Sequence, residues 1–125
     1  MSYRLYTVRI FTRDWLKARA FYRDTLGMVE KYASEDIGWA EFDAGSASLA
    51  LERTAADDSE ADDLVGRFAG ISLAVENIAG TYESLVEKGV EFLNPPARQP
   101  WGGVLAHFKD PDGNIITLLG EPGEP

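Results

Sequence analysis

The chain has 125 residues, the length of one ordinary domain, and its 45% hydrophobic and 26% charged residues are typical of a globular protein. Asp and Glu outnumber Lys and Arg by 21 to 12, and the formal charge of −9 argues against nucleic-acid partners, which need clustered cations. The absence of cysteine excludes disulfides and thiolate metal sites, and no apolar run approaches the roughly 20 residues that span a membrane.

The N-terminus lacks the features of a secretory signal, because residues 1–4 contain neither a cluster of positive charges nor a following apolar stretch. We therefore expect a cytoplasmic protein with a single domain over residues 1–125. An acidic run at residues 57–63 contributes five of the negative charges. We interpret it as part of a solvated linker, residues 55–67, rather than as a cation site.

The first half of the chain begins with a strand of alternating apolar and polar residues, followed by a polar helix cap and a helix that ends in glycine. Several short strands come after the helix. In chain order, we predict a strand at 6–11, an N-cap at Asp14, a helix over 15–26 that ends at Gly27, and strands at 28–32, 38–42 and 47–53.

The second half repeats this plan, with one residue fewer in its helix. The pattern predicts a strand at 71–75, an N-cap at Asn77, a helix over 78–88 that ends at Gly89, and strands at 91–93, 104–109 and 114–119. The repeat predicts an α+β fold of two tandem βαβββ modules, residues 4–54 and 68–120, whose curved mixed sheets surround a cleft, with the helices outside.

Alternation within the strands predicts which side chains line the cleft, because residues i and i+2 share a face. One face is apolar and suits packing under a helix, with Val8, Ile10, Leu49, Leu51, Ile71, Leu73, Ile116 and Leu118. The other face carries many small and polar residues, which is more typical of a cavity wall than of a filled core. It carries Thr7, Arg9, Phe11, Ser48, Ala50, Glu52, Gly70, Ser72, Ala74, Ile115, Thr117 and Leu119. A solvated sheet face is the alternative interpretation.

Two sequence motifs, one in each half of the chain, carry a resemblance to a known family. Residues 21–27 read Phe-Tyr-Arg-Asp-Thr-Leu-Gly at the end of the first helix, and residues 110–114 read Asp-Pro-Asp-Gly-Asn before an apolar strand, after the loop at 99–103. These stretches resemble the vicinal-oxygen-chelate superfamily, which includes glyoxalase I, bleomycin-resistance proteins, fosfomycin-resistance enzymes and extradiol dioxygenases. The resemblance covers nearly the whole chain and implies the βαβββ fold.

The resemblance also identifies four positions where metal-dependent members place His, Gln or Glu ligands, one on the first and one on the last strand of each module. These positions are Thr7, Ala50, Gly70 and Thr117 in this chain. None is a credible ligand for a divalent transition metal, which prefers imidazole or carboxylate donors. We therefore expect a member of the superfamily with no metal and no other cofactor.

Two polar residues are candidates for a role in the cleft. His107 shares strand parity with Leu105 and is expected to face the cleft as a general base or a hydrogen-bonding group, with simple packing on the sheet as the alternative. Arg9 requires an anionic partner, either Glu52 or a ligand carboxylate.

Aromatic residues are expected to form the walls of a site for a flat ligand. Trp39 and Phe11 lie on predicted strands, whereas Trp101 lies in a loop rich in proline and glycine and is expected at the rim. Trp15, at the start of the first helix, is interpreted as a core or dimer contact.

The sequence thus predicts a metal-independent small-molecule binding protein of the glyoxalase and bleomycin-resistance type, with an aromatic or cationic ligand and antibiotic sequestration as one use. The alternatives are a metal-independent isomerase, lyase or cyclase with His107 as general base, or a scaffold whose own side chains fill the cavity. The resemblance also implies a homodimer. The expected ligand-binding residues are Thr7, Arg9, Phe11, Trp39, Ala50, Glu52, Gly70, Ser72, Trp101, Leu105, His107 and Thr117.

Overall fold

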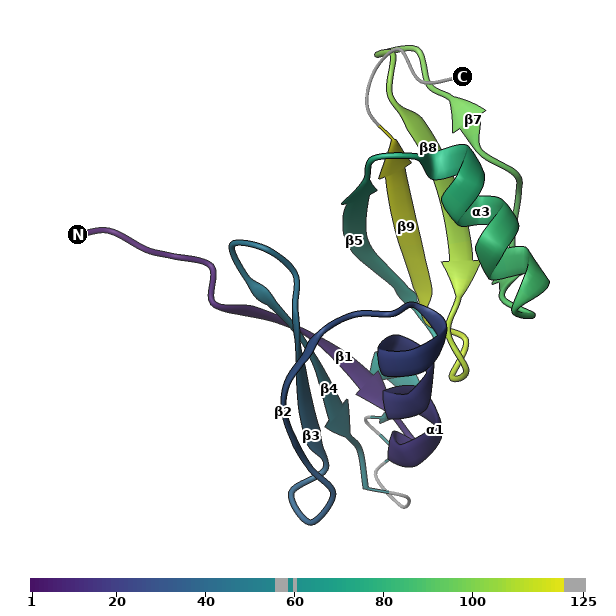
Figure 1. The fold of residues 1–125 in the computed structure, drawn as a ribbon. Helices are drawn as coiled ribbons and strands as arrows, with labels where there is room; N and C mark the ends of the chain where they lie inside the picture. Colours follow the sequence, from purple (N-terminus) through teal and green to yellow (C-terminus); the bar gives the residue numbers. More distant parts are fainter. Residues whose placement is uncertain (56–58, 60, 121–125) are drawn as a thin grey trace. The chain divides into compact units, whose positions relative to one another are not determined.

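The computed structural model describes residues 1–55, 59 and 61–120 (Figure 1). The chain divides into two compact units, Met1–Gly66 and Arg67–Pro125, which we call the first and second units. Each unit contains one curved mixed sheet, and the predicted α+β class is confirmed.

The first unit is a βαβββ module followed by a short helical turn. Its strand order is β1-β4-β3-β2, with β1 and β4 parallel and the other pairs antiparallel. The elements are β1 (Thr7–Thr12), α1 (Trp15–Ala20), the π-helical turn η1 (Phe21–Thr25), β2 (Glu30–Ser34), β3 (Trp39–Asp43), β4 (Ser48–Arg53) and α2 (Ala61–Leu64).

The second unit has the same connectivity, with one short strand added. Its order is β5-β9-β8-β6, again with the first and last strands of the module parallel, and β7 also pairs with β8. The elements are β5 (Phe68–Val75), α3 (Ile78–Glu87), β6 (Glu91–Phe92), β7 (Ala97–Arg98), β8 (Val104–Lys109) and β9 (Ile115–Gly120).

Both main helices begin where their caps predict. The Asp14 side chain accepts a hydrogen bond from the Lys17 amide, and the Asn77 side chain accepts one from the Gly80 amide. Each bond satisfies one of the amides that a helix leaves unpaired at its start. The residues after the helices, Gly27 and Gly89, both adopt the left-handed conformation common after a helix end, with φ of +73° and +89°.

The first helix changes from α-helical to π-helical geometry before it ends. In η1 the Leu26 amide donates to the Phe21 carbonyl, a bond that spans five residues. A π-helical turn is the geometry that one inserted residue produces in an α-helix. It therefore accommodates the extra residue by which the first predicted helix exceeds the second.

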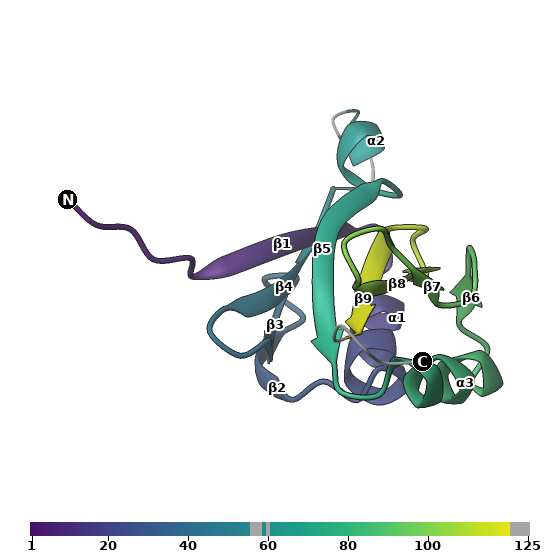
Figure 2. The same ribbon diagram turned by 90° about the horizontal axis from the view of Figure 1, so that it is seen from above.

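The apolar strand faces pack under the helices, as the alternation predicts. In the first unit the Tyr22 ring lies 6.1 Å from the Phe42 ring, and Phe42 is directly opposite Leu49. In the second unit Tyr82 of α3 contacts Phe92 of β6 at 4.7 Å between ring centroids, in the region where α3 and β6 lie close together in Figure 2. Phe92 is in turn directly opposite the fully buried Phe108 on β8.

Short elements depart from the sequence prediction. The strand β7 was not expected, and part of the predicted acidic linker, Ala61–Leu64, forms the helical turn α2, in which Ala61 is fully buried. Asp62 of that turn forms an ion pair with Arg13 at 2.6 Å. Residues 57, 58 and 60 of the acidic run, and residue 56 before it, lie outside the described residues. Elements of this length carry too little periodicity to be recognised from periodicity alone.

Candidate functional site

The face of the first sheet that points away from α1 carries six of the predicted ligand-binding residues. Strand register places them in adjacent rows, because residues that pair across strands share a face. One row contains Arg9, Ala50 and Glu41, and the next contains Phe11, Glu52 and Trp39. Thr7 lies in the flanking row, where its hydroxyl donates to the Ser48 carbonyl at 3.1 Å. We call this surface the first open face.

Arg9 forms an ion pair with Glu52 on this face, with 2.9 Å between Nη1 and Oε1. The central guanidinium carbon of Arg9 also lies 5.4 Å from the centroid of the Phe11 ring, within cation–π distance. Ala50, directly opposite Arg9, leaves room for the arginine side chain to reach across to the next row. The pair is one of the two interpretations that the sequence allowed for Arg9.

Glu41 belongs to the first open face and was missed in the sequence analysis. Its carboxylate accepts hydrogen bonds from the Trp39 indole at 3.2 Å and from the Tyr6 hydroxyl at 3.3 Å. Glu41 shares strand parity with Trp39, and this signal was available from the sequence. The contact with Tyr6 spans 35 residues and depends on tertiary structure.

The corresponding face of the second sheet carries five further predicted residues on β5, β8 and β9. His107 and Thr117 are directly opposite each other, with 2.8 Å between Nδ1 and Oγ1, and Ser72 is opposite Thr117 on the other side. The Phe68 ring lies edge-on to the His107 ring, 5.9 Å away. We call this surface the second open face; it also carries Leu105.

Gly70 has a backbone role in β5. Its φ of +71° lies in the left-handed region, and the register between β5 and β9 shifts between Phe68 and Ser72, as in a β-bulge. An added Cβ would meet only Phe68, at 3.9 Å. The conformation, rather than lack of space, is therefore the reason for glycine at this position.

Trp101 and Trp15 have different environments. Trp101 is 63% exposed in the loop after β7, and its ring covers Gly103 so closely that a Cβ at Gly103 would collide with it. Trp15 is buried, and the central guanidinium carbon of Arg19 lies 5.5 Å from the centroid of its ring. Trp15 thus belongs to the core, one of the two roles expected for it.

The four positions that correspond to metal ligands in the superfamily offer no metal-binding set. Within residues 1–55, 59 and 61–120 there is no group of three or more His, Asp or Glu side chains arranged to hold a metal ion. The carboxylate Glu52 on the first open face is already engaged by Arg9. These donors therefore do not fit a transition metal, which needs several imidazole or carboxylate ligands.

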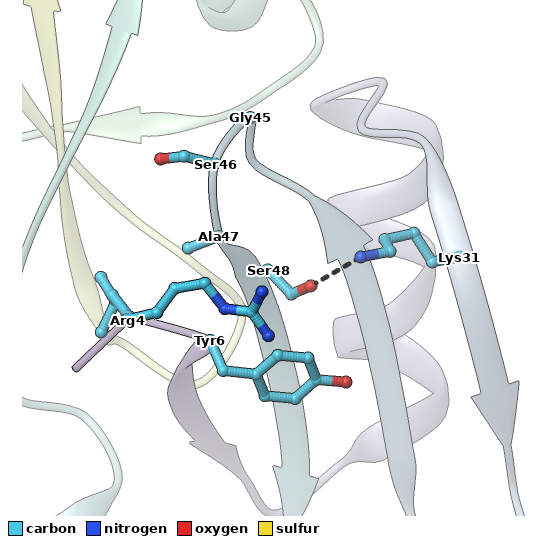
Figure 3. A pocket seen from close by; sticks show the side chains of 8 residues that line it. Arg4, Tyr6, Lys31, Gly45, Ser46, Ala47 and Ser48 are labelled. Carbon is cyan, nitrogen blue, oxygen red and sulfur yellow. Dashed lines mark hydrogen bonds between the residues drawn. The ribbon is translucent and has the colours of Figure 1, made fainter. Parts of the chain in front are cut away.

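A small hollow lies at the edge of the first open face, beside the start of β4 (Figure 3). Its volume is about 220 Å³. None of the predicted ligand-binding residues contributes to its wall. The lining residues are Arg4, Leu5, Tyr6, Lys31, Gly45, Ser46, Ala47 and Ser48.

The family model of the Glyoxalase/Bleomycin resistance protein/Dioxygenase superfamily matches residues 4–118, and the chain belongs to this superfamily. The family predicted from the motifs is thereby confirmed. Within the described part of the chain, no helix is long and apolar enough to cross a membrane.

The similar proteins include an uncharacterized protein, a probable enzyme and a binding protein. The chain is 32% identical over 123 residues to the uncharacterized protein YraH of Bacillus subtilis (strain 168), covering 92% of this chain and 96% of YraH. It is 30% identical over 113 residues to a probable lactoylglutathione lyase of Synechocystis sp. (strain PCC 6803), covering 85% and 86% of the two chains. The crystal structure of TnmS3, an antibiotic binding protein from Streptomyces sp. CB03234, is similar with a TM-score of 0.77, 27% identity and 96% coverage of both chains.

Proposed function

We propose that the chain is a metal-independent small-molecule binding protein that holds a flat, cationic ligand on the first open face. The observation that carries the proposal is the row in which Glu52 lies between Phe11 and Trp39. Neighbouring strands are about 4.8 Å apart, so the Cα atoms of the two aromatic residues are separated by roughly 10 Å. A flat ring needs about 3.5–4.0 Å on each side. Phe11 is buried and the Arg9 guanidinium lies over its ring, so a ligand that stacks on Trp39 would reach Phe11 and Glu52 by displacing the Arg9 side chain.

The charges on this face favour a cation. Glu41 and Glu52 are partly accessible, and the single cation among the paired rows, Arg9, neutralises one of them. The Arg9 guanidinium is itself a planar cation that lies on the Phe11 ring and binds Glu52. Its contacts illustrate the chemistry that a ligand cation would use, which is stacking combined with a charge-assisted hydrogen bond.

The relatives support binding as the activity. TnmS3 is described as an antibiotic binding protein, and antibiotic sequestration is therefore the biological use that we propose for this chain. We also propose a cytoplasmic location and a homodimeric assembly. The residues of the second open face, including Ser72, Leu105 and His107, are proposed as ligand contacts of the second unit.

Calorimetric titration with three flat probes tests the proposal: proflavine, which is cationic, phenazine, which is neutral, and 9-anthracenecarboxylate, which is anionic. We expect proflavine to bind most tightly. Trp39→Ala should raise the Kd of proflavine by about 5- to 150-fold, because a buried stacking contact contributes about 1–3 kcal/mol to binding. Glu41→Gln should weaken proflavine binding and leave phenazine binding unchanged.

Glu35→Gln provides a matched control, because Glu35 is an exposed glutamate in the turn between β2 and β3 of the same unit. It removes the same charge without touching the first open face. Equal effects of Glu35→Gln and Glu41→Gln would show that only net charge matters. Failure of all three probes to bind at millimolar concentration would contradict the proposed function.

An enzyme is the second candidate, and the contact between His107 and Thr117 favours it. This contact orients the imidazole through Nδ1 and leaves Nε2 as the nitrogen for proton transfer with a substrate. Turnover of lactoylglutathione, the compound in the name of the Synechocystis relative, is the direct assay. An enzyme would lose turnover in His107→Ala and retain its affinity for ligand, whereas the binding protein would show no turnover in either form.

A further inference from the structure

The hollow beside the start of β4 collects positive charge in an acidic protein. It is lined by two cations, Arg4 and Lys31, and by no Asp or Glu, although the chain has 21 acidic residues and 12 basic ones. Five of the ten other Lys and Arg residues form ion pairs with carboxylates, namely Arg9, Arg13, Arg19, Arg23 and Lys109. Within the described part of the chain, neither Arg4 nor Lys31 forms an ion pair.

The donors of the hollow come from separate segments and converge on Ser48. Lys31 on β2 donates to the Ser48 hydroxyl with 3.0 Å between Nζ and Oγ, and Ser48 is only 1% exposed. Figure 3 shows the Arg4 guanidinium and the Lys31 ammonium directed towards Ser48 from opposite sides. A serine hydroxyl that accepts one hydrogen bond still has a proton to donate, so three donors are available at one place.

We propose that this hollow binds a small oxyanion, a phosphate or carboxylate group, between Arg4, Lys31 and Ser48. Its volume of about 220 Å³ is below the roughly 300–1,000 Å³ of pockets for drug-sized ligands, and it therefore suits one ionic group. Arginine and lysine supply the charge-assisted hydrogen bonds that such oxygens accept. The Tyr6 hydroxyl already donates to Glu41, so Tyr6 contributes its ring as a wall of the site.

This site is distinct from the proposed ligand site, because its donors Arg4, Lys31 and Ser48 are not among Phe11, Trp39, Glu41 and Glu52. The two sites meet only where Tyr6, in the wall of the hollow, donates to Glu41. Its ligand chemistry is also opposite, since the first open face presents carboxylates and the hollow presents cations. The two activities can therefore be tested separately on the same full-length protein.

The test is a titration of the isotope-labelled full chain with sodium phosphate and with sodium acetate, at ionic strength held constant with sodium chloride. Amide NMR signals of residues 4–6, 31 and 45–48 should shift together and saturate. Arg4→Gln and Lys31→Gln should each raise the Kd by about tenfold, the effect expected for the loss of one charge-assisted hydrogen bond. Both side chains are exposed, so the variants should remain folded, which circular dichroism checks.

Lys17→Gln is the matched control, because it removes an exposed lysine of the same unit from α1, outside the hollow. It should leave both affinities unchanged. Tighter binding of phosphate than acetate would assign the site to phosphate groups, and the reverse order would assign it to carboxylates. Shifts spread over the whole surface, equal losses in Lys17→Gln, or no saturable binding of either anion would overturn the proposal.

Discussion

At the scale of single residues, the contact between Arg19 and Glu30 joins the first helix to the start of β2. It is bidentate, with 2.8 Å from Nε to Oε2 and 2.8 Å from Nη2 to Oε1, and both side chains are largely shielded from solvent. The hydrogen bonds from Arg19 hold the pKa of the Glu30 carboxyl below its ordinary value of 4.5. Shielding and two-point geometry distinguish this pair from an exposed ion pair.

The lowered pKa predicts a loss of stability in acid. Because the folded protein binds the Glu30 proton less tightly than the unfolded chain does, the stabilisation is present above pH 4.5 and disappears as the pH falls through the lowered pKa. Glu30→Gln should therefore reduce the free energy of unfolding by about 1 kcal/mol at pH 7 and by much less in acid. Urea denaturation at a series of pH values measures this difference. An unchanged difference between the variant and the natural protein across the series would contradict the argument.

At the scale of elements, the Asp-Pro-Asp-Gly-Asn turn illustrates how a family motif acts through hydrogen bonds. Asp110 Oδ1 accepts from the amides of Asp112 and Asn114, both at 2.9 Å, and Oδ2 accepts from the Asn114 side chain at 3.0 Å. Asp110 and Asn114 are both buried. The motif thus closes the hairpin between β8 and β9, and its role in this chain is structural.

Asp110→Ala should be strongly destabilising, because it removes the acceptors for buried donors. We expect a loss of about 2–4 kcal/mol in the free energy of unfolding, measured by urea denaturation. Asp36→Ala, which changes an exposed aspartate in the turn between β2 and β3, should change stability by less than about 0.5 kcal/mol. Similar effects of the two substitutions would show that the buried hydrogen bonds are not the cause.

At the scale of the whole molecule, homodimer formation remains a prediction from the family resemblance. The edge strand β2 and its flanking residues expose large apolar side chains, including Val29 at 68% and Tyr32 at 52%. An exposed strand edge with apolar side chains can pair with a second chain. We therefore expect light scattering to give about 27.6 kDa, twice the chain mass of 13.8 kDa, at micromolar concentration. A mass of 13.8 kDa that does not change with concentration would contradict this prediction.

Much of the architecture was predictable from the sequence because its signals are local. The caps Asp14 and Asn77 and the strand alternation depend on residues a few positions apart. They predicted the ends of the elements to within two residues, except for the start of β5, which lies three residues earlier than predicted. Alternation also predicted that Arg9 and Glu52 share a face. The short elements α2 and β7 were not predicted, since a few residues carry little periodicity, whereas the equally short β6 was placed by the repeat of the first half.

The contacts between segments were decided by tertiary structure alone. Register places Arg9 beside Ala50, and folding brings Tyr6 to Glu41 and Lys31 to Ser48. No local pattern identifies such partners, because they lie 17 to 41 residues apart along the chain. The local sequence specifies which residue types each strand presents. Three-dimensional packing selects which of them meet, because long-range pairing depends on the register of whole strands.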